Sequence, residues 1–168
     1  MFLDESGSHI AMTRDYAWGP RGARVEGRVP RNRGTVLTML GALSHRGVCA
    51  IMTNLGGTSR DVFLRFVRDH LVPVLRPGNV VVMDNLGAHH ARGVRELLEA
   101  AGARPMFMPP YSPDLNAIEL CWSKLKGILK AIGARTVPKL RDAIRLAATR
   151  ITPDDARAWF AHCGAQPG

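Results

Sequence analysis

A short apolar run that ends in a carboxylate constrains the fold more than any other stretch of this sequence. Residues 79–84 read Asn-Val-Val-Val-Met-Asp, and turn-forming residues flank them on both sides. A run of this length is typical of a strand buried on both faces, as in the middle of a parallel sheet. In open α/β sheets, ligands bind at the carboxyl ends of such strands. The run therefore predicts an α/β fold with a candidate site at Asp84.

Two further carboxylates are expected at the same edge of the sheet. Asp4 follows the short apolar entry of residues 1–3, and Glu119 starts a helix after the proline-rich residues 109–116. A pair of divalent ions needs several hard oxygen ligands, and Mg²⁺ combines carboxylates with substrate phosphate oxygens. Asp4, Asp84 and Glu119 are therefore candidate ligands of two ions that would catalyse phosphoryl transfer.

Each carboxylate also has a purely structural interpretation. Asp84 could turn the chain after its strand, and Asp4 could point into water near the terminus. Asn116 and Glu119 have the spacing of a capping box, in which each side chain bonds a backbone amide of the other. The sequence alone leaves both interpretations open.

The helix that starts near Asn116 carries lysines along one flank. Its apolar stripe comprises Ile118, Cys121, Leu125, Ile128, Leu129 and Ile132. At about 100° per residue, Lys126 and Lys130 lie within about 20° of Glu119, at the flank of that stripe. We expect them, with Lys124 on the same helix, to bind a DNA backbone. A solvated helix face would also explain these lysines.

The charge of the chain indicates its class of partner. Of 168 residues, 23 are Lys or Arg and 14 are Asp or Glu, so the net charge is 23 − 14 = +9. A domain this basic is typical of proteins that bind a polyanion, most often nucleic acid. The length fits one domain, residues 1–168. Three widely spaced cysteines predict no disulfide framework or zinc knuckle, and no apolar run reaches the roughly 18 residues of a membrane span. A cytoplasmic protein is expected.

An arginine-rich segment separates the first two expected strands. Residues 20–33 contain Arg21, Arg24, Arg28, Arg31 and Arg33 against a single acid, Glu26. A solvated mobile loop and an arm that follows phosphates are equally good interpretations. At its start, residues 18–22 favour a tight turn anchored by a partly buried Trp18 over a direct role in ligand binding.

The remaining periodicities predict a mixed sheet flanked by helices. After the entry strand we expect a hairpin of residues 35–43 and 48–53, then strands 79–84 and 104–108. Helices are expected from residues 58 or 59, 91, 116, 136 and 152. The first of these should bury Val62, Phe63, Phe66, Val67 and His70.

Three blocks of the sequence resemble the catalytic blocks of one family. These are residues 4–6 (Asp-Glu-Ser), 84–89 (Asp-Asn-Leu-Gly-Ala-His) and 109–119 (Pro-Pro-Tyr-Ser-Pro-Asp-Leu-Asn-Ala-Ile-Glu). They look like those of DDE transposases of the mariner-like superfamily, in its bacterial insertion-sequence branch. The 119 − 84 − 1 = 34 residues between Asp84 and Glu119 also match that branch. The resemblance covers nearly the whole chain.

This resemblance implies a ribonuclease H-like, retroviral integrase-like fold with a five-stranded mixed sheet. It implies cut-and-paste DNA transposition, with strand cleavage and transfer supported by Mg²⁺ or Mn²⁺. Asp4, Asp84 and Glu119 would be both the catalytic residues and the metal ligands. Asn85, His89 and Asn116 match motif positions that would support the site, whereas His90 has no assigned role.

The resemblance also carries two departures and an expectation about partners. Ala117 replaces the proline usual after Asn116, and the N-terminal helix-turn-helix region that recognises transposon ends is not among these residues. A separate or frameshift-fused recognition half, double-stranded DNA and a homodimeric state are expected, with no membrane. Two alternatives stay open: a stand-alone ribonuclease H-like nuclease, and an inactive DNA-binding remnant or regulator.

Overall fold

Five strands form a mixed sheet in the order β3-β2-β1-β4-β5. The structure is a computed structural model that describes residues 1–90, 92–110 and 112–165. The strands are β1 (Phe2–Ser8), β2 (Leu37–Ser44), β3 (Gly47–Leu55), β4 (Val80–Met83) and β5 (Arg104–Phe107). β1, β2 and β3 pair antiparallel, whereas β4 pairs parallel with both β1 and β5. The predicted hairpin and mixed sheet are confirmed, and the ends of β2, β3, β4 and β5 are shifted by one or two residues. The first strand was expected to end at Asp4, but β1 continues to Ser8, so Asp4 lies inside the strand.

The helices begin at the caps that the sequence predicted. They are α1 (Arg60–Phe66), α2 (Arg92–Ala100), α3 (Ala117–Ile132), α4 (Val137–Thr149) and α5 (Pro153–His162). Ser59, Thr136 and Thr152 each accept a hydrogen bond from a first-turn amide, which satisfies a donor that the helix itself leaves unpaired. The expected start of α2 at Ala91 lies outside the described residues.

A π turn changes the buried face after α1. Residues Val67–Leu71 (η1) form this turn, and Val72–Val74 (η2) follow as a 3₁₀ turn. A π turn inserts one residue into the helical repeat. The prediction that His70 faces inward is therefore wrong: His70 is exposed, and Leu71 takes the buried position instead.

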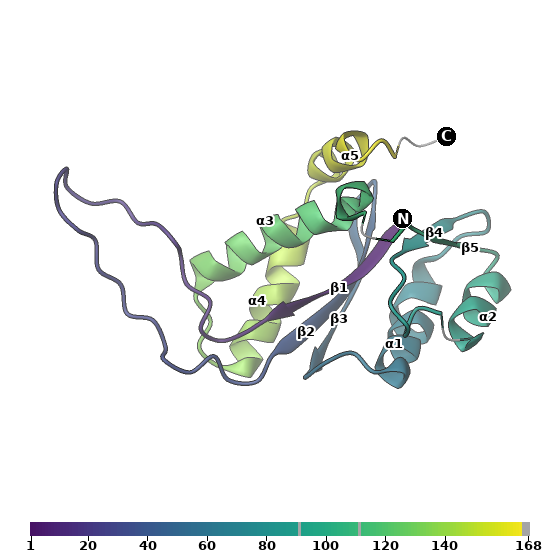
Figure 1. The fold of residues 1–168 in the computed structure, drawn as a ribbon, viewed down its shortest axis with the longest axis horizontal. Helices are drawn as coiled ribbons and strands as arrows, with labels where there is room; N and C mark the ends of the chain where they lie inside the picture. Colours follow the sequence, from purple (N-terminus) through teal and green to yellow (C-terminus); the bar gives the residue numbers. More distant parts are fainter. Residues whose placement is uncertain (91, 111, 166–168) are drawn as a thin grey trace.

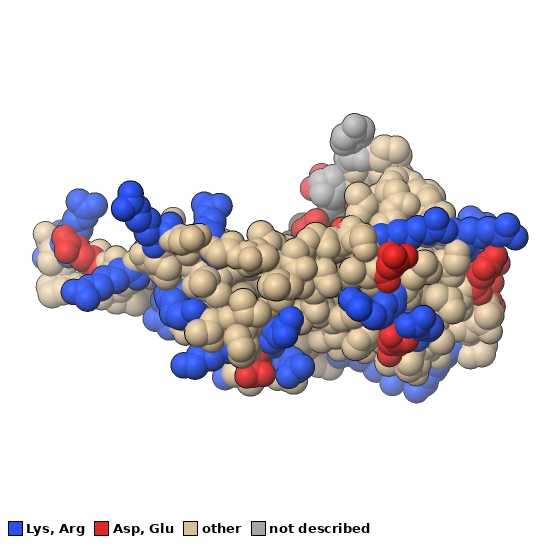
Figure 2. Space-filling model, turned by 90° about the horizontal axis from the view of Figure 1, so that it is seen from below, with Lys and Arg blue, Asp and Glu red and all other residues tan. Residues whose placement is uncertain are grey.

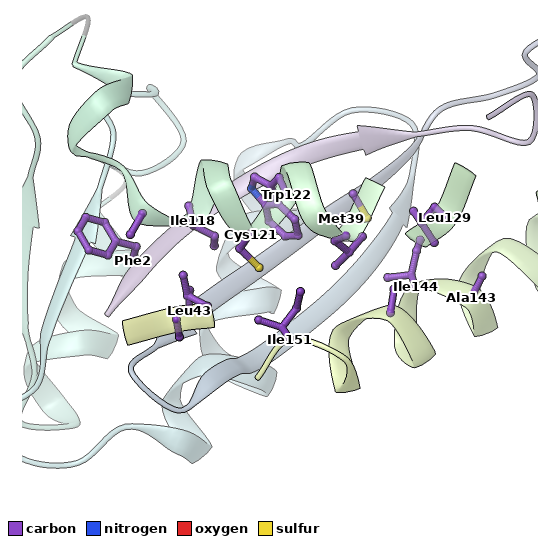
Figure 3. Packing of buried hydrophobic residues seen from close by; sticks show 14 of the residues in the cluster. Phe2, Met39, Leu43, Ile118, Cys121, Trp122, Leu129, Ala143, Ile144 and Ile151 are labelled. Carbon is purple, nitrogen blue, oxygen red and sulfur yellow. The ribbon is translucent and has the colours of Figure 1, made fainter. Parts of the chain in front are cut away.

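Helices cover both faces of the sheet (Figure 1). α3, α4 and α5 pack on one face over an apolar cluster that includes Leu43, Ile118 and Ile144, shown in Figure 3. α1 and α2 cover the other face over a second cluster centred on Phe63, Phe66 and Leu98. The two clusters make the sheet the middle layer of a three-layer α/β/α arrangement.

β4 is less buried than the sequence predicted. Val81 and Met83 are fully buried, but Val80 and Val82 on the opposite face are only partly covered. α3 packs mainly over β1 and β2, which leaves this face of β4 nearer to solvent.

One close contact fixes the distance between α3 and the sheet. The indole of Trp122 lies against Gly41, where an added Cβ would come within 2.6 Å of the Trp122 ring. Gly41 of β2 is paired with Asp4 of β1. The missing side chain at position 41 therefore lets α3 approach the strand that carries Asp4.

The long connection between β1 and β2 projects away from the rest of the molecule (Figure 1). Nearly every residue from 14 to 36 is exposed. The prediction that Trp18 is partly buried is wrong, because its side chain is fully exposed, at 102%. No helix in the described part of the chain is long and apolar enough to cross a membrane.

Candidate active site

Asp4 lies in the central strand β1 and is almost completely buried. One carboxylate oxygen accepts the Glu5 amide at 2.7 Å, and the other accepts the Asn116 side-chain amide at 3.1 Å. Burial raises the pKa of Asp4 to about 7, and the negative charges of Glu119 and Asp84 add to this effect. The structure thus holds a carboxyl group beside two acidic neighbours, where ionisation is unfavourable unless a cation is present.

Asp84 comes directly after β4 and meets Asp4 through the parallel register. Phe2 pairs with Val82, so the same register carried two residues further brings Asp4 beside Asp84. One Asp84 oxygen accepts the Leu86 amide at 3.0 Å. That oxygen also lies 2.6 Å from Nδ1 of His89. These contacts orient a carboxylate that remains about half exposed.

His89 connects Asp84 to a second acid. The His89 ring is buried against Phe63, with ring centroids 4.2 Å apart, and its Nε2 lies 3.7 Å from Glu5. Burial alone would lower the pKa of His89, but the Glu5 and Asp84 carboxylates outweigh it and raise that pKa. His89 therefore sits between two carboxylates, and its predicted support of the Asp84 loop agrees with this geometry.

Glu119 lies in the first turn of α3 and is exposed. The capping-box interpretation is wrong, because the Asn116 side chain makes no cap hydrogen bond. That side chain is buried and donates to Asp4 instead, which ties the start of α3 to β1. Asn116 thus positions Glu119 relative to Asp4.

Five of the predicted site residues, which are Asp4, Asp84, Asn85, Asn116 and Glu119, line one cavity of about 460 Å³. Its lining residues are Asp4, Asp84, Asn85, Leu86, Met108, Pro109, Pro110, Ser112, Asn116 and Glu119. Asn85 closes one side by donating to the Met108 carbonyl, and its oxygen lies 3.3 Å from His90, which stacks on Phe107. Three carboxylates from β1, the end of β4 and the start of α3 therefore open into one space.

This space is not a closed metal site as it stands. Within residues 1–90, 92–110 and 112–165, no three His, Cys, Asp or Glu side chains form a group that could hold an ion. Only Asp4 is held rigidly on both oxygens, whereas Glu119 is exposed on its helix. The three carboxylates share a cavity without forming a complete ligand set.

Two of the three predicted DNA-binding lysines have acidic partners within the chain. Lys124 pairs with Asp155 of α5, and Lys130 pairs with Asp15. Lys126 lies between them on α3 and is partly exposed. The lysines share a helix with Glu119, but two of them already have partly neutralised charges.

Sequence reasoning did not single out Glu5 as a site residue. Glu5 faces away from Asp4, because successive side chains of a strand point to opposite faces. Only the fold brings it to His89, which lies far along the chain. The alternation of side chains along β1 indicates which face of the sheet Glu5 lies on. It does not indicate that His89 is its neighbour.

The sequence matches the family described as DDE superfamily endonuclease over residues 1–141. The chain belongs to this family. A comparison with curated protein sequences finds no match. The bacterial insertion-sequence branch remains a prediction.

The fold of this DDE domain is similar to that of solved structures of Mos1 transposase. It is similar to Mos1 transposase in a strand transfer complex, with a TM-score of 0.70 and 17% identity over 97% of this chain and 50% of that one. For the mariner Mos1 paired-end complex with Mg, the TM-score is 0.67 and the sequence identity is 19%. The match covers 98% of this chain and 51% of that one. For the Mos1 catalytic domain alone, the TM-score is 0.60 and the sequence identity is 14%. The match covers 97% of this chain and 75% of that one.

At these identities the likeness establishes the fold. The predicted ribonuclease H-like architecture, a mixed five-stranded sheet flanked by five helices, is confirmed. This DDE domain spans about half the length of the Mos1 chains in those complexes.

Proposed function

We propose that this chain is the catalytic domain of a DNA transposase that cuts and joins DNA strands by metal-dependent phosphoryl transfer. The observation that carries the proposal is the convergence of Asp4, Asp84 and Glu119 on one cavity. Membership of the DDE endonuclease family and the Mos1-like fold support it.

The residues present fit divalent ions. All three carboxylates offer hard oxygens, the donors that Mg²⁺ and Mn²⁺ prefer. Asn116 adds a buried amide oxygen that has no hydrogen-bond partner among the described residues. Mos1 structures contain Mg or Mn, in agreement with this donor set. We propose that Asp4, Asp84 and Glu119 hold two such ions.

Bound there, divalent ions supply Lewis-acid polarisation of the phosphate and activation of the attacking water or 3′-hydroxyl. The protein side chains have three tasks. Asp4 forms the fixed wall of the site, because the sheet and Asn116 hold both of its oxygens. His89 and the Leu86 amide hold Asp84 in a single orientation. Glu119 would add the third carboxylate ligand from the first turn of α3.

The DNA partner is inferred from charge and from the relatives. The chain carries a net charge of +9, and Mos1 structures include complexes with transposon ends. We propose that transposon ends and target DNA are the substrates and that a helix-turn-helix half recognises the ends. A homodimer is proposed as the working form.

The test is divalent-ion-dependent cleavage of a labelled transposon end by the chain fused to a helix-turn-helix half, with Asp84 intact and with Asp84→Asn. The variant should lose cleavage by about 10³-fold or more, equivalent to about 4 kcal/mol in the barrier. Its salt-dependent DNA binding should stay within about twofold, because the substitution removes the charge but keeps the size of the side chain. Unchanged cleavage in Asp84→Asn would remove Asp84 from the site.

The same assay separates the alternatives. A transposase domain should cut transposon ends only after fusion to a helix-turn-helix half. Cutting of arbitrary duplex without that fusion would favour a stand-alone nuclease. Binding without cleavage in either form would favour an inactive remnant.

A further inference from the structure

Glu5 is an acid that the proposed function does not use. On the face shown in Figure 2, acidic side chains lie in small groups among more numerous basic ones. Glu5 is instead largely covered: its side chain is 22% exposed, and its Oε2 is buried without a hydrogen-bond partner among the described residues. Leaving a carboxylate oxygen buried and unpaired costs free energy, so the position of this oxygen requires an explanation.

Glu5 lies on the face of the sheet opposite to the catalytic cavity, because successive residues of a strand point to opposite faces. Asp4 is paired with Gly41, which contacts Trp122 of α3, so Asp4 lies on the face that α3 covers. Glu5 is paired with Leu40, a member of the apolar cluster under α1 and α2. The two neighbouring acids are therefore in different layers, and of the two only Asp4 lines the cavity.

His89 links Glu5 to the catalytic cavity. Its ring is completely buried and packs against Phe63 of α1. Nδ1 lies 2.6 Å from Oδ1 of Asp84 and 3.3 Å from the carbonyl oxygen of the same residue. On the other side of the ring, Nε2 lies 3.7 Å from Oε2 of Glu5. The ring therefore stands between an acid of the α1 layer and a carboxylate that lines the cavity.

The two buried atoms that face each other are complementary. Nε2 of His89, like Oε2 of Glu5, has no hydrogen-bond partner within residues 1–90, 92–110 and 112–165. Their separation of 3.7 Å is longer than an N–H···O bond, which ends near about 3.2 Å. A small rotation of the flexible Glu5 side chain closes this gap. A protonated imidazole donates from both nitrogens, so it can bond Glu5 and Asp84 at the same time.

We propose that Glu5 is a positioning residue of the catalytic cavity, which acts through His89 to fix the orientation of Asp84 and so raises the affinity of the cavity for a divalent cation. This inference rests on the proposed function, because it takes Asp84 as a metal ligand. Hydrogen-bond partners behind a ligand tune metal affinity by limiting the orientations that the ligand can take. A role of Glu5 in stability alone is the alternative that the experiment tests.

The experiment compares variants of the full chain with the wild type. Glu5→Met keeps the length of the side chain and removes the acceptor, and Glu5→Ala serves as a second variant if Glu5→Met does not fold. Glu5→Gln keeps an acceptor oxygen. The control is Glu96→Met, which removes the same charge from an exposed position on α2. Urea unfolding gives the stability of each variant.

The first measurement needs neither metal nor DNA. Correlation spectra of ¹⁵N and ¹H on the metal-free protein detect the Nε2–H of His89, and His89→Gln identifies its signal. A bond to a carboxylate moves this signal downfield and slows its exchange with water. The signal should be kept in Glu5→Gln and Glu96→Met, and should move upfield or disappear in Glu5→Met. An unchanged signal in Glu5→Met would overturn the proposal.

The second measurement is the Kd for Mn²⁺ alone, followed by the electron paramagnetic resonance signal of the free ion. Glu5→Met should raise this Kd about 10-fold, Glu5→Gln by no more than about threefold, and Glu96→Met by less than about twofold. Equal values for Glu5→Met and Glu96→Met, or a Glu5→Gln as weak as Glu5→Met, would overturn the proposal. Absence of Mn²⁺ binding by the wild type would do the same.

Cleavage of a transposon end by the chain fused to a helix-turn-helix half separates positioning from stability. In Glu5→Met the half-saturating Mn²⁺ concentration should rise about 10-fold, with the maximum rate within about threefold of the wild type. A lower maximum rate at an unchanged half-saturating concentration would show a structural role only, and would overturn the proposal.

The same measurements distinguish the two proposals. If the variants follow the expected order of Mn²⁺ affinity but the wild type never cleaves, the positioning inference stands and the transposase proposal fails. If the wild type cleaves and Glu5→Met matches it at every Mn²⁺ concentration, the transposase proposal stands and the positioning inference fails.

Discussion

Asp4 and Glu119 face the same cavity but are held in different ways. Asp4 belongs to the central strand, is buried, and has both oxygens hydrogen-bonded. Glu119 stands exposed in the first turn of a helix, and its position depends on how α3 packs. One side of the cavity is therefore preset by the sheet, whereas the other is set by a helix contact.

Among the described residues, no three potential ligands form a group that could hold an ion. Burial of Asp4 also raises its pKa to about 7. Without a cation, the carboxyl group is therefore mostly protonated below that pH. The Glu119 side chain is exposed in the first turn of α3. We infer that the sheet side defines where a cation binds and that the helix side adjusts to it.

The largest losses of cleavage should come from removing the charge of Asp4 on the sheet side or of Glu119 on the helix side. Asp4→Asn and Glu119→Gln should each lower divalent-ion-dependent cleavage by about 10³-fold, because each removes a proposed ligand. Their stabilities should differ. At pH 8 without metal, Asp4→Asn should stabilise the fold by about 2 kcal/mol, whereas Glu119→Gln should change it by less than about 0.5 kcal/mol. Urea unfolding of both variants measures this, and equal stabilities would contradict the comparison.

The stability of the metal-free protein should fall as pH rises from about 4 to about 7. In this window the native Asp4 keeps a proton that the unfolded chain, with a pKa of 3.8, has lost. The native state then binds more protons, so the free energy of unfolding decreases with pH. The raised pKa of His89 acts in the same direction above its ordinary value of 6.5.

Thermal unfolding across this pH range, with and without Mg²⁺, measures the effect. Saturating Mg²⁺ should stabilise the protein more at pH 8 than at pH 5, because the ion competes with the Asp4 proton. Asp4→Asn should remove the lower part of the slope. A slope unchanged in that variant would show that Asp4 does not titrate in this window.

A smaller effect on cleavage is expected when the hydrogen bond between Asn116 and Asp4 is removed. Its size distinguishes a role in orienting Asp4 from a role in capping a helix. Asn116→Ala should lower cleavage by about 10- to 100-fold, because Asp4 loses a hydrogen bond that orients it. Thr136→Ala is the matched control, since it removes a cap from α4 at a cost of about 1 kcal/mol. Steady-state cleavage and urea unfolding are measured together. Similar stability losses with similar activities would mean that Asn116 is only structural.

The smallest effect concerns the lysines on the helix side. Lys126→Ala should weaken duplex binding by about fivefold and flatten the salt slope by about 1, as expected for one phosphate contact. Lys124→Ala should change the slope less, because Asp155 already offsets its charge. Anisotropy titrations against salt compare the two variants. A larger loss for Lys124→Ala would reverse this order.

The parts that sequence could predict are those set by local patterns. The apolar run before Asp84, the caps at Thr136 and Thr152, and the family blocks each lie within a few neighbouring residues. They were enough to predict the mixed sheet and to place Asp4, Asp84 and Glu119 at one cavity.

The parts that sequence missed depend on contacts between distant residues. Asn116 matches a capping pattern locally, yet its amide bonds Asp4, 112 residues earlier. His89 lies close to Glu5, which is 84 residues earlier in the chain. Trp18 was expected to anchor its turn, but the turn projects beyond any surface that could cover the ring.

The contact between Gly41 and Trp122 implies a rule for how such chains can diverge. Any side chain at position 41 would push α3 outward unless the residue at position 122 became smaller at the same time. The two positions should therefore change together among relatives: small at 41 with large at 122, or the reverse. A relative that changed only one of the two positions would have the start of α3 displaced, and Glu119 would be displaced with it.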